Sequence, residues 1–414
     1  MKWKIVFPLL TLIPLLTVAG DAGLTLDGAI DLALKQNPEI QLAVKKLEEA
    51  RGQRLQMEAV SNPEVVFSDE GLGLTKNSTG GMEKEISFGV QQYLEFPGKR
   101  AYREKLGRFG EERVALELER ARRIVRAAVK KSYYKALLSQ KIVETLEANS
   151  VWMDQLIENL LIKYQAGSTL YVDVLRARVE KARLQNQLIE EKRGGGTARI
   201  ELNLLLGRDG YTPMNFLTEM AYSPKGPDVT RLMEEARISG LSLMIATIKR
   251  RQTETGLKLA KMNLLPDFTL GLFSPSLRTN AWGFSIGVSV PMYWWKKQRG
   301  EVMEAQALHD MAGIAVGQME LRRVALVKNA LSGVASAEEQ VKLYEHTLLR
   351  EMEDELSISL SQYQFGKVEF FNLLDIYRTC AAARLDHLKS LYLYFVSLAD
   401  LEVEGDECVE KEST

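Results

Sequence analysis

The chain has 414 residues, a formal net charge of −1 and charged residues of both signs throughout its length. This balance lacks the basic surface typical of nucleic-acid binding, so no nucleic-acid partner is predicted. Two cysteines, Cys380 and Cys408, are too few for a disulfide framework.

The first 22 residues are typical of a secretory signal peptide. Lys2 and Lys4 precede an apolar run over 5–16, and small residues follow it. The alternative, an N-terminal membrane anchor, is disfavoured because the run is short and contains two prolines. Beyond residue 22 no stretch of about 20 apolar residues occurs, so no transmembrane helix is predicted.

Landmarks in the chain recur after about 200 residues, which is far too long a period for a solenoid unit. Gly167 follows Tyr-Gln-Ala, and Gly366 follows Tyr-Gln-Phe. Pro63 and Pro266 each follow a helical stretch and open a strand-like one. The pattern predicts a tandem duplication, with repeats over 23–222 and 223–405 and an acidic tail over 406–414. Each repeat should contain a helix, two strands and a long helical hairpin.

Four strands are predicted at about 64–74, 83–94, 267–274 and 281–291. The clearest runs from Trp282 to Val290, where large apolar residues alternate with glycine and serine. Each strand has the length of a tilted membrane-crossing strand. An ordinary soluble β-sandwich is the alternative.

Aromatic residues near the strand ends predict an interfacial girdle. The girdle candidates are Tyr93, Phe96, Trp282, Tyr293, Trp294 and Trp295.

Long helices are predicted over about 99–165 and 298–364, each returning after a glycine as a second helix. Small residues at heptad-like spacing in the first should let neighbouring helices approach closely. Gly194, Gly195 and Gly196 interrupt the first return helix, and we expect a kink or break there.

Four strands cannot form a closed barrel, and a sheet in lipid must close. Two copies would supply eight strands, and three would supply twelve with room for a water-filled lumen. The predicted fold class is therefore mainly α with a small membrane β-barrel contribution that is shared between copies.

Four passages resemble the outer-membrane efflux channel family typified by TolC, and in particular its heavy-metal efflux members. They are LALKQNPEI (32–40), QYLEFPGKR (92–100), YQAGSTLYVDVLRA (164–177) and YQFGKVEFFNLLDI (363–376). The resemblance implies a homotrimer with a 12-stranded barrel in the bacterial outer membrane, above an α-helical tube in the periplasm. It also implies a passive exit duct that works with a periplasmic adaptor, or membrane fusion protein, and an inner-membrane pump of the RND type.

The resemblance also implies roles for residues near the hairpin tips. Gly167, Ser168, Gly366 and Lys367 would dock the adaptor. Asp375, with Asn372, would form the pore constriction, where three like charges would attract cations. Asp173 and Arg176 would make interhelical contacts that close the entrance. The alternative for Asp375 is a solvent-exposed capping residue without a pore role.

No arrangement typical of an enzyme, a cofactor site or a metal site is found. The three histidines share no ligand spacing, and methionines 303, 311 and 319 are expected to serve helix packing. Two other functions stay open: the outer-membrane component of a type I protein secretion system, and a soluble periplasmic coiled-coil adaptor.

Overall fold

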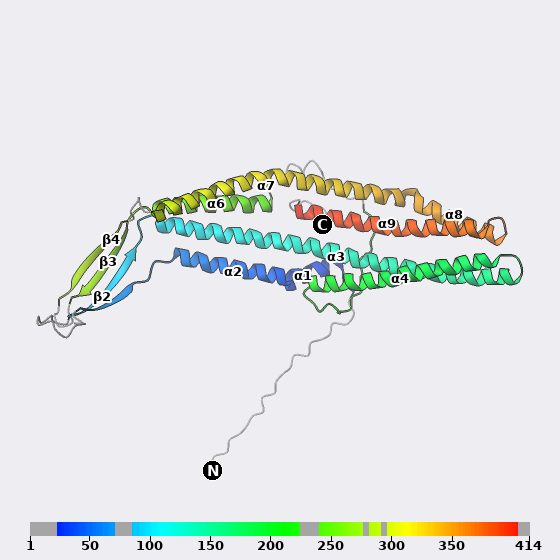
Figure 1. The fold of residues 1–414 in the computed structure, drawn as a ribbon, viewed down its shortest axis with the longest axis horizontal. Helices are drawn as coiled ribbons and strands as arrows, with labels where there is room; N and C mark the ends of the chain where they lie inside the picture. Colours follow the sequence, from blue (N-terminus) through cyan, green and yellow to red (C-terminus); the bar gives the residue numbers. More distant parts are fainter. Residues whose placement is uncertain (1–22, 71–84, 224–239, 276–280, 291–295, 405–414) are drawn as a thin grey trace, which may run out of the picture.

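The structure, a computed structural model, describes residues 23–70, 85–223, 240–275, 281–290 and 296–404. Figure 1 shows an elongated molecule, in which a layer of long helices carries a small sheet at one end and helical hairpins at the other. The predicted signal peptide and the tail over 406–414 lie outside the described residues.

Each half of the chain contributes one long helical hairpin. In the first half, α3 (Lys99–Gln165) returns as α4 (Tyr171–Leu205). In the second half, α7 (Lys296–Leu343), a π-helical turn (Tyr344–Leu348) and α8 (Leu349–Gln364) form one rod that returns as α9 (Phe370–Glu404). The common plan confirms the predicted duplication of a helix, two strands and a hairpin.

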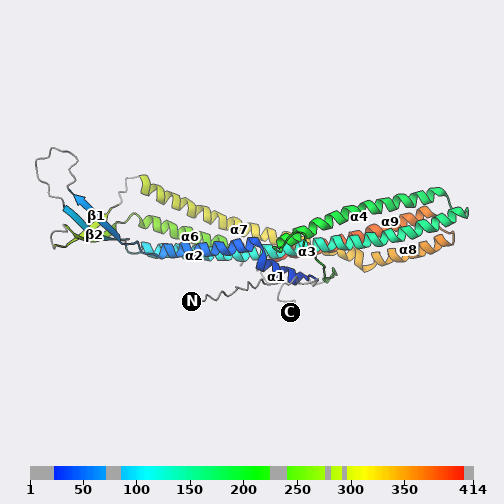
Figure 2. The same cartoon turned by 90° about the horizontal axis from the view of Figure 1, so that it is seen from below.

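Shorter helices complete the layer. They are α1 (Leu26–Gln36), α2 (Pro38–Glu58) and α6 (Leu241–Met262). Helix α2 packs on α3, α3 on α6, and α6 on α7. Figure 1 shows α2 and α7 at opposite edges of this layer, and Figure 2 shows the hairpins continuing beyond it.

One residue, Asn37, separates α1 from α2 and determines where α2 begins. Its side-chain oxygen accepts hydrogen bonds from the backbone amides of Glu39 at 2.8 Å and Ile40 at 3.4 Å, while Pro38 occupies the first helical position. The side-chain amide of Asn37 donates to the carbonyl of Leu205 at 2.8 Å, which joins the start of α2 to the end of α4.

The three consecutive glycines do not break α4, which is continuous from Tyr171 to Leu205, so the predicted break is wrong. The hydroxyl of Ser139 on α3 donates to the carbonyl of Glu191 at 3.1 Å. A Cβ at Gly195 would lie 2.7 Å from that hydroxyl oxygen, whereas Gly194 faces open space. Close packing of α4 on α3 thus explains Gly195 and holds the helix together despite the low propensity of glycine.

The sheet is antiparallel, with the strand order β1-β2-β3-β4. Its strands are β1 (Glu64–Glu70), β2 (Glu85–Leu94), β3 (Asp267–Ser274) and β4 (Gly283–Ser289). Strand β4 is shorter than the predicted 281–291. Ser289 pairs with Asp267, the first residue of β3, and Pro266 before it has no amide to continue the ladder.

The two faces of the sheet differ in chemistry, as the alternating sequence predicts. One face carries large exposed apolar side chains, with Phe67 67% and Ile286 65% accessible to solvent. The register places Ser87, Gly89, Gly271 and Ser285 on the other face, where they line an open concavity of about 430 Å³. Strands β1 and β4 each have only one neighbour in the described chain, so both edges of the sheet are open.

The buried core lies between the helices. In the middle of the molecule, Tyr133 of α3 is fully buried, and its hydroxyl donates to the carbonyl of Leu24 at 2.7 Å. A second apolar cluster fills the hairpins, around Leu160, Val174 and Leu373. Among the helices of the described ranges, none combines the length and the apolar composition needed to cross a membrane.

Candidate functional site

The tip of the first hairpin is a compact turn centred on Gly167. Its φ is +72°, a left-handed conformation that glycine adopts without strain. The amides of Gly167 and Ser168 donate to the carbonyls of Tyr164 and Lys163, each at 2.9 Å. This pair of bonds is a Schellman motif, which ends α3 and reverses the chain.

The tip of the second hairpin repeats this geometry. Gly366 has a φ of +74°, and its amide donates to the carbonyl of Tyr363 at 3.1 Å. The amide of Lys367 donates to the carbonyl of Gln362 at 2.9 Å. The two tips therefore present the same backbone shape with different side chains: Ser168 at one and Lys367 at the other.

Asp173 and Arg176 contact one another on the first turns of α4. Arg176 Nη1 lies 3.3 Å from Asp173 Oδ1, and the hydroxyl of Thr169 donates to Asp173 Oδ2 at 3.1 Å. The guanidinium of Arg176 also lies 5.5 Å from the ring centroid of Phe371 on α9, a cation–π distance. Within one chain, Arg176 thus makes an interhelical contact of the predicted kind, with Phe371.

Asn372 and Asp375 lie one turn apart on the exposed side of α9. Leu373 and Leu374, between them, are buried in the hairpin core. This core fixes the orientation of α9 and keeps the carboxylate of Asp375 on the surface of the single chain. No described residue forms an ion pair with Asp375.

Just behind the tips, an ion pair between a buried carboxylate and a partly exposed guanidinium joins the two repeats. Glu180 of α4 is 8% exposed and accepts hydrogen bonds from Arg378 of α9 at 2.9 Å (Nε) and 2.5 Å (Nη2). Nearby, Lys163 Nζ lies 4.0 Å from the ring centroid of Tyr363. Burial raises the pKa of the Tyr363 hydroxyl, which stays neutral beside this cation. The sequence analysis missed the Glu180–Arg378 pair because neither position stands out from the many charged residues on these helices.

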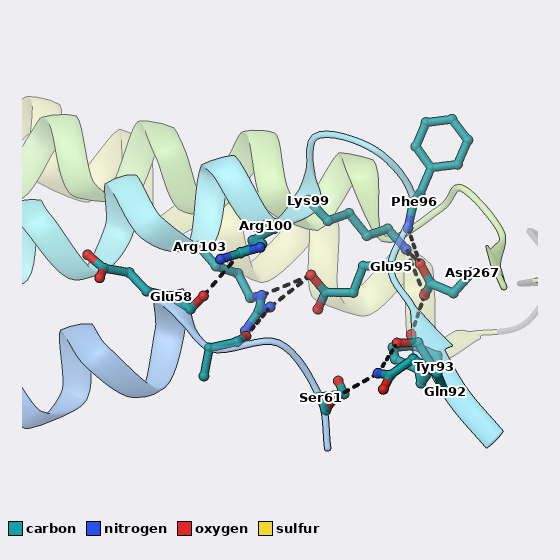
Figure 3. A network of polar contacts seen from close by, with 11 residues as sticks. Glu58, Ser61, Gln92, Tyr93, Glu95, Phe96, Lys99, Arg100, Arg103 and Asp267 are labelled. Carbon is teal, nitrogen blue, oxygen red and sulfur yellow. Dashed lines mark hydrogen bonds and ion pairs between the residues drawn. The ribbon is translucent and has the colours of Figure 1, made fainter. Parts of the chain in front are cut away.

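A second polar cluster lies where the sheet joins the helices, as Figure 3 shows. Lys99, the first residue of α3, is buried, and its ammonium contacts Asp267 Oδ1 at 2.8 Å and Oδ2 at 2.9 Å. It also donates to the carbonyl of Leu265 at 2.9 Å. The hydroxyl of Tyr93 donates to Asp267 Oδ2 at 2.6 Å, and the amide of Phe96 donates to Oδ1 at 2.8 Å. Three donor groups from the first repeat thus converge on one carboxylate and one carbonyl of the second.

Further contacts in Figure 3 tie β2 and α3 to the end of α2. Arg103 contacts Glu95 at 2.8 Å and donates to the carbonyl of Ala59 at 3.2 Å. Arg100 donates to the carbonyl of Glu58 at 3.1 Å. The junction therefore fixes the angle at which the sheet leaves the helical layer.

The predicted girdle residues fall into separate groups. Tyr93 lies on the small-residue face of the sheet, since it follows Ser87, Gly89 and Gln91 at even spacing, and it binds Asp267 instead. Phe96 follows β2 at the same end of the sheet. Trp282 is exposed just before β4, at the opposite end. Tyr293, Trp294 and Trp295 lie outside the described residues.

The part of the chain that the structure describes contains no group of three or more His, Cys, Asp or Glu side chains placed to hold a metal ion. Cys380 is a buried thiol, and burial raises its pKa.

An open sheet with one apolar face and one small-residue face, continuous with a layer of very long helices, defines a wall segment of a membrane channel with a helical extension. The profile of the family described as "Outer membrane efflux protein" matches residues 29–208 and 232–403. The chain belongs to this family of outer-membrane efflux channels, with its sheet in the outer membrane and its helical tube in the periplasm.

The chain is also similar to individual proteins over nearly its whole length. It is 24% identical to the "Cobalt-zinc-cadmium resistance protein CzcC" of Cupriavidus metallidurans over 384 residues, which cover 91% of this chain and 89% of the relative. Its fold matches the structure of CusC with a TM-score of 0.76 and 19% identity, covering 92% of each chain. It matches VceC of Vibrio cholerae with a TM-score of 0.76 and 15% identity, covering 92% of this chain and 96% of the other.

Proposed function

We propose that three copies of this chain form the exit duct of a tripartite efflux system and conduct substrates passively to the cell exterior. The single observation that carries this proposal is the four-stranded sheet with two open edges and an apolar face. Such a sheet is stable in lipid only when further strands close it. Three copies give twelve strands and a lumen lined by the small-residue face.

The native mass and the conductance of detergent-extracted protein test this proposal. Native mass spectrometry should show three copies, and planar bilayers should show discrete open channels. A stable, folded monomer without channel activity would refute the proposal. The type I secretion alternative shares this duct, and no feature of the described residues favours it.

We propose heavy-metal cations as the substrate class. Support comes from the full-length similarity to a protein named for cobalt, zinc and cadmium resistance, and from the QYLEFPGKR passage. A strain without this chain should become more sensitive to these three metals, and the intact gene should restore tolerance. Sensitivity to hydrophobic drugs with unchanged metal tolerance would instead indicate a drug efflux duct.

The hairpin tips face the inner membrane in this proposal and dock a periplasmic adaptor, which connects the duct to a pump of the RND type. The support is the exposed pair of matching turns at Gly167–Ser168 and Gly366–Lys367. Arg176 and Asp173, directly behind the first tip, would hold the entrance closed at rest.

Three copies of Asp375 would form the narrowest negative ring, with Asn372 one turn away. The support is their exposure on α9 near the tip. Replacing Asp375 with alanine should lower cation selectivity in bilayers. The matched control is Asp386→Ala, because Asp386 is an exposed acid further along α9 that pairs with Lys389 at 3.3 Å. Unchanged selectivity in Asp375→Ala would remove this residue from the pore.

A further inference from the structure

At the junction between sheet and helices, Lys99 of the first repeat pairs with Asp267 of the second. Lys297, the equivalent lysine of the second repeat, has no ion-pair partner in the described chain. We propose that Lys297 of one copy forms an ion pair with Glu64 of the neighbouring copy, at the boundary where β4 of the first meets β1 of the second. This inference rests on the homotrimer of the proposed function and specifies how its copies are joined.

The template is the Lys99–Asp267 pair. It connects the strand hairpin of the first repeat to that of the second, because Lys99 follows β2 and Asp267 opens β3. Strands β2 and β3 are neighbours, with Leu94 opposite Phe268. The pair therefore seals a boundary between repeats, and in a closed ring every second boundary of this kind lies between copies.

The sequence places the same two charges at the boundary between copies. Glu64 follows Pro63 and opens β1, as Asp267 follows Pro266 and opens β3. Lys297 is the second residue of α7, after β4, as Lys99 is the first residue of α3, after β2. The duplicated chain thus supplies an acid at the start of each hairpin and a lysine after its end.

The register gives both acids the same orientation. Glu64 is opposite Gln91 in β2, on the face that carries Ser87 and Gly89. Asp267 is opposite Ser289 in β4, on the face that carries Ser285 and Gly287. Both carboxylates therefore lie on the small-residue face at the helical end of the sheet.

Glu64 and Lys297 cannot form an ion pair with each other within one chain. Strands β1 and β4 are the two edges of the sheet, so they are separated by three interstrand spacings, roughly 14 Å. Lys297 is exposed, and no described residue forms an ion pair with it. Glu64 is also exposed, and among the described residues its Oε2 accepts one side-chain hydrogen bond, from the amide of Gln91 at 2.9 Å. An acid and a base are thus presented at opposite edges that must meet when the sheet closes.

The helical layer supports the same neighbour. Within the chain, α3 packs on α6 below the boundary between β2 and β3. The equivalent contact below the boundary between β4 and β1 would join α7 to α2 of the next copy. Helix α7 carries an exposed apolar stripe suited to this contact: Met303, which is 75% exposed, with Met311, Ile314 and Leu321. A second copy, rather than lipid, is the occupant that covers both the stripe and the charge.

Crosslinking tests the proposed pair in the full-length protein. In a background with Cys380→Ala and Cys408→Ser, we would combine Glu64→Cys with Lys297→Cys and treat the detergent-extracted protein with a short bismaleimide. Covalent dimers and trimers are expected. The matched control, Lys99→Cys with Asp267→Cys, should crosslink within one chain and yield no covalent dimer. Each single-cysteine variant should also remain monomeric in denaturing gels.

Charge reversal provides a second measurement. Glu64→Lys and Lys297→Glu should each speed trimer dissociation about tenfold, and the double reversal should restore the original rate. The inference would be overturned, and the proposed function left intact, by a native trimer that gives no crosslink between copies and whose dissociation rate is not restored by the double reversal. A wild-type protein that is strictly monomeric would refute the homotrimer itself, and this pair with it.

Discussion

Removing the carboxylate of Asp267 should destabilise the protein far more than removing a typical surface acid. The side chain of Lys99 is 5% exposed and that of Asp267 is 17% exposed, so the pair is shielded from water. In Asp267→Ala the buried ammonium would retain, among the described residues, only the carbonyl of Leu265 as an acceptor. Breaking a buried pair on one side costs about 3–5 kcal/mol, because the remaining charge is left without compensation.

The measurement is the free energy of unfolding in urea, followed by circular dichroism in detergent at one fixed protein concentration. The matched control is Asp400→Ala, which breaks the pair between Lys131 and Asp400, whose side chains are 35% and 51% exposed. Such an exposed pair contributes at most about 1 kcal/mol.

Replacing both partners with apolar residues of similar size separates the effect of the unpaired charge from the effect of lost side-chain volume. In Lys99→Met with Asp267→Leu no buried charge remains, so most of the lost stability should return. The reasoning would be refuted if Asp267→Ala destabilised the protein no more than Asp400→Ala, or if the double variant were as unstable as the single one.

Three further predictions concern separate parts of the fold. Gly366→Ala should destabilise the second tip by about 1 kcal/mol, because its φ of +74° strains any residue with a Cβ; faster amide exchange at the tip would show this. Gly194→Ala should stabilise α4 by up to about 1 kcal/mol, whereas Gly195→Ala should not, since its Cβ would meet a serine hydroxyl of α3; equal unfolding midpoints would contradict this. The Lys342 ammonium, 2.7 Å away, lowers the pKa of Glu338 below its usual 4.5. Glu338 therefore adds stability above pH 4.5 that is lost as the pH falls, so Glu338→Gln should be less stable than wild type at pH 7 by under about 1 kcal/mol and equal to it at low pH.

The sequence was sufficient to predict the class of fold because its two periodicities are unambiguous. Alternation from Trp282 to Val290 predicted a strand with unlike faces, and the structure has that strand with its apolar side exposed. The glycines at 167 and 366 predicted the chain reversals, since a left-handed residue is needed to end such long helices. Both signals are local, and in both places the packing of the folded chain agrees with them.

The contacts between repeats could not be predicted in the same way. Glu180 and Arg378 are 198 residues apart, and nothing local indicates that their helices meet. The error at Gly194–Gly196 has the same origin, because helix propensity alone ignores the packing of α4 on α3. The Lys99–Asp267 ion pair has a signal in the sequence, because a proline followed by an acid occurs at 63–64 and again at 266–267.

The π-helical turn at Tyr344–Leu348 shows how the duplicated halves stay matched despite unequal lengths. Lys99 and Gly167 are 68 positions apart, whereas Lys297 and Gly366 are 69 apart, so the second rod is longer by one residue. An extra residue in a regular α-helix would rotate everything beyond it by about 100° and move the buried side of the rod out of the core. A π-helical turn accommodates one additional residue within a helix, and α8 then continues with Tyr363 buried. The second tip thereby keeps the turn geometry of the first, which a ring of alternating repeats requires.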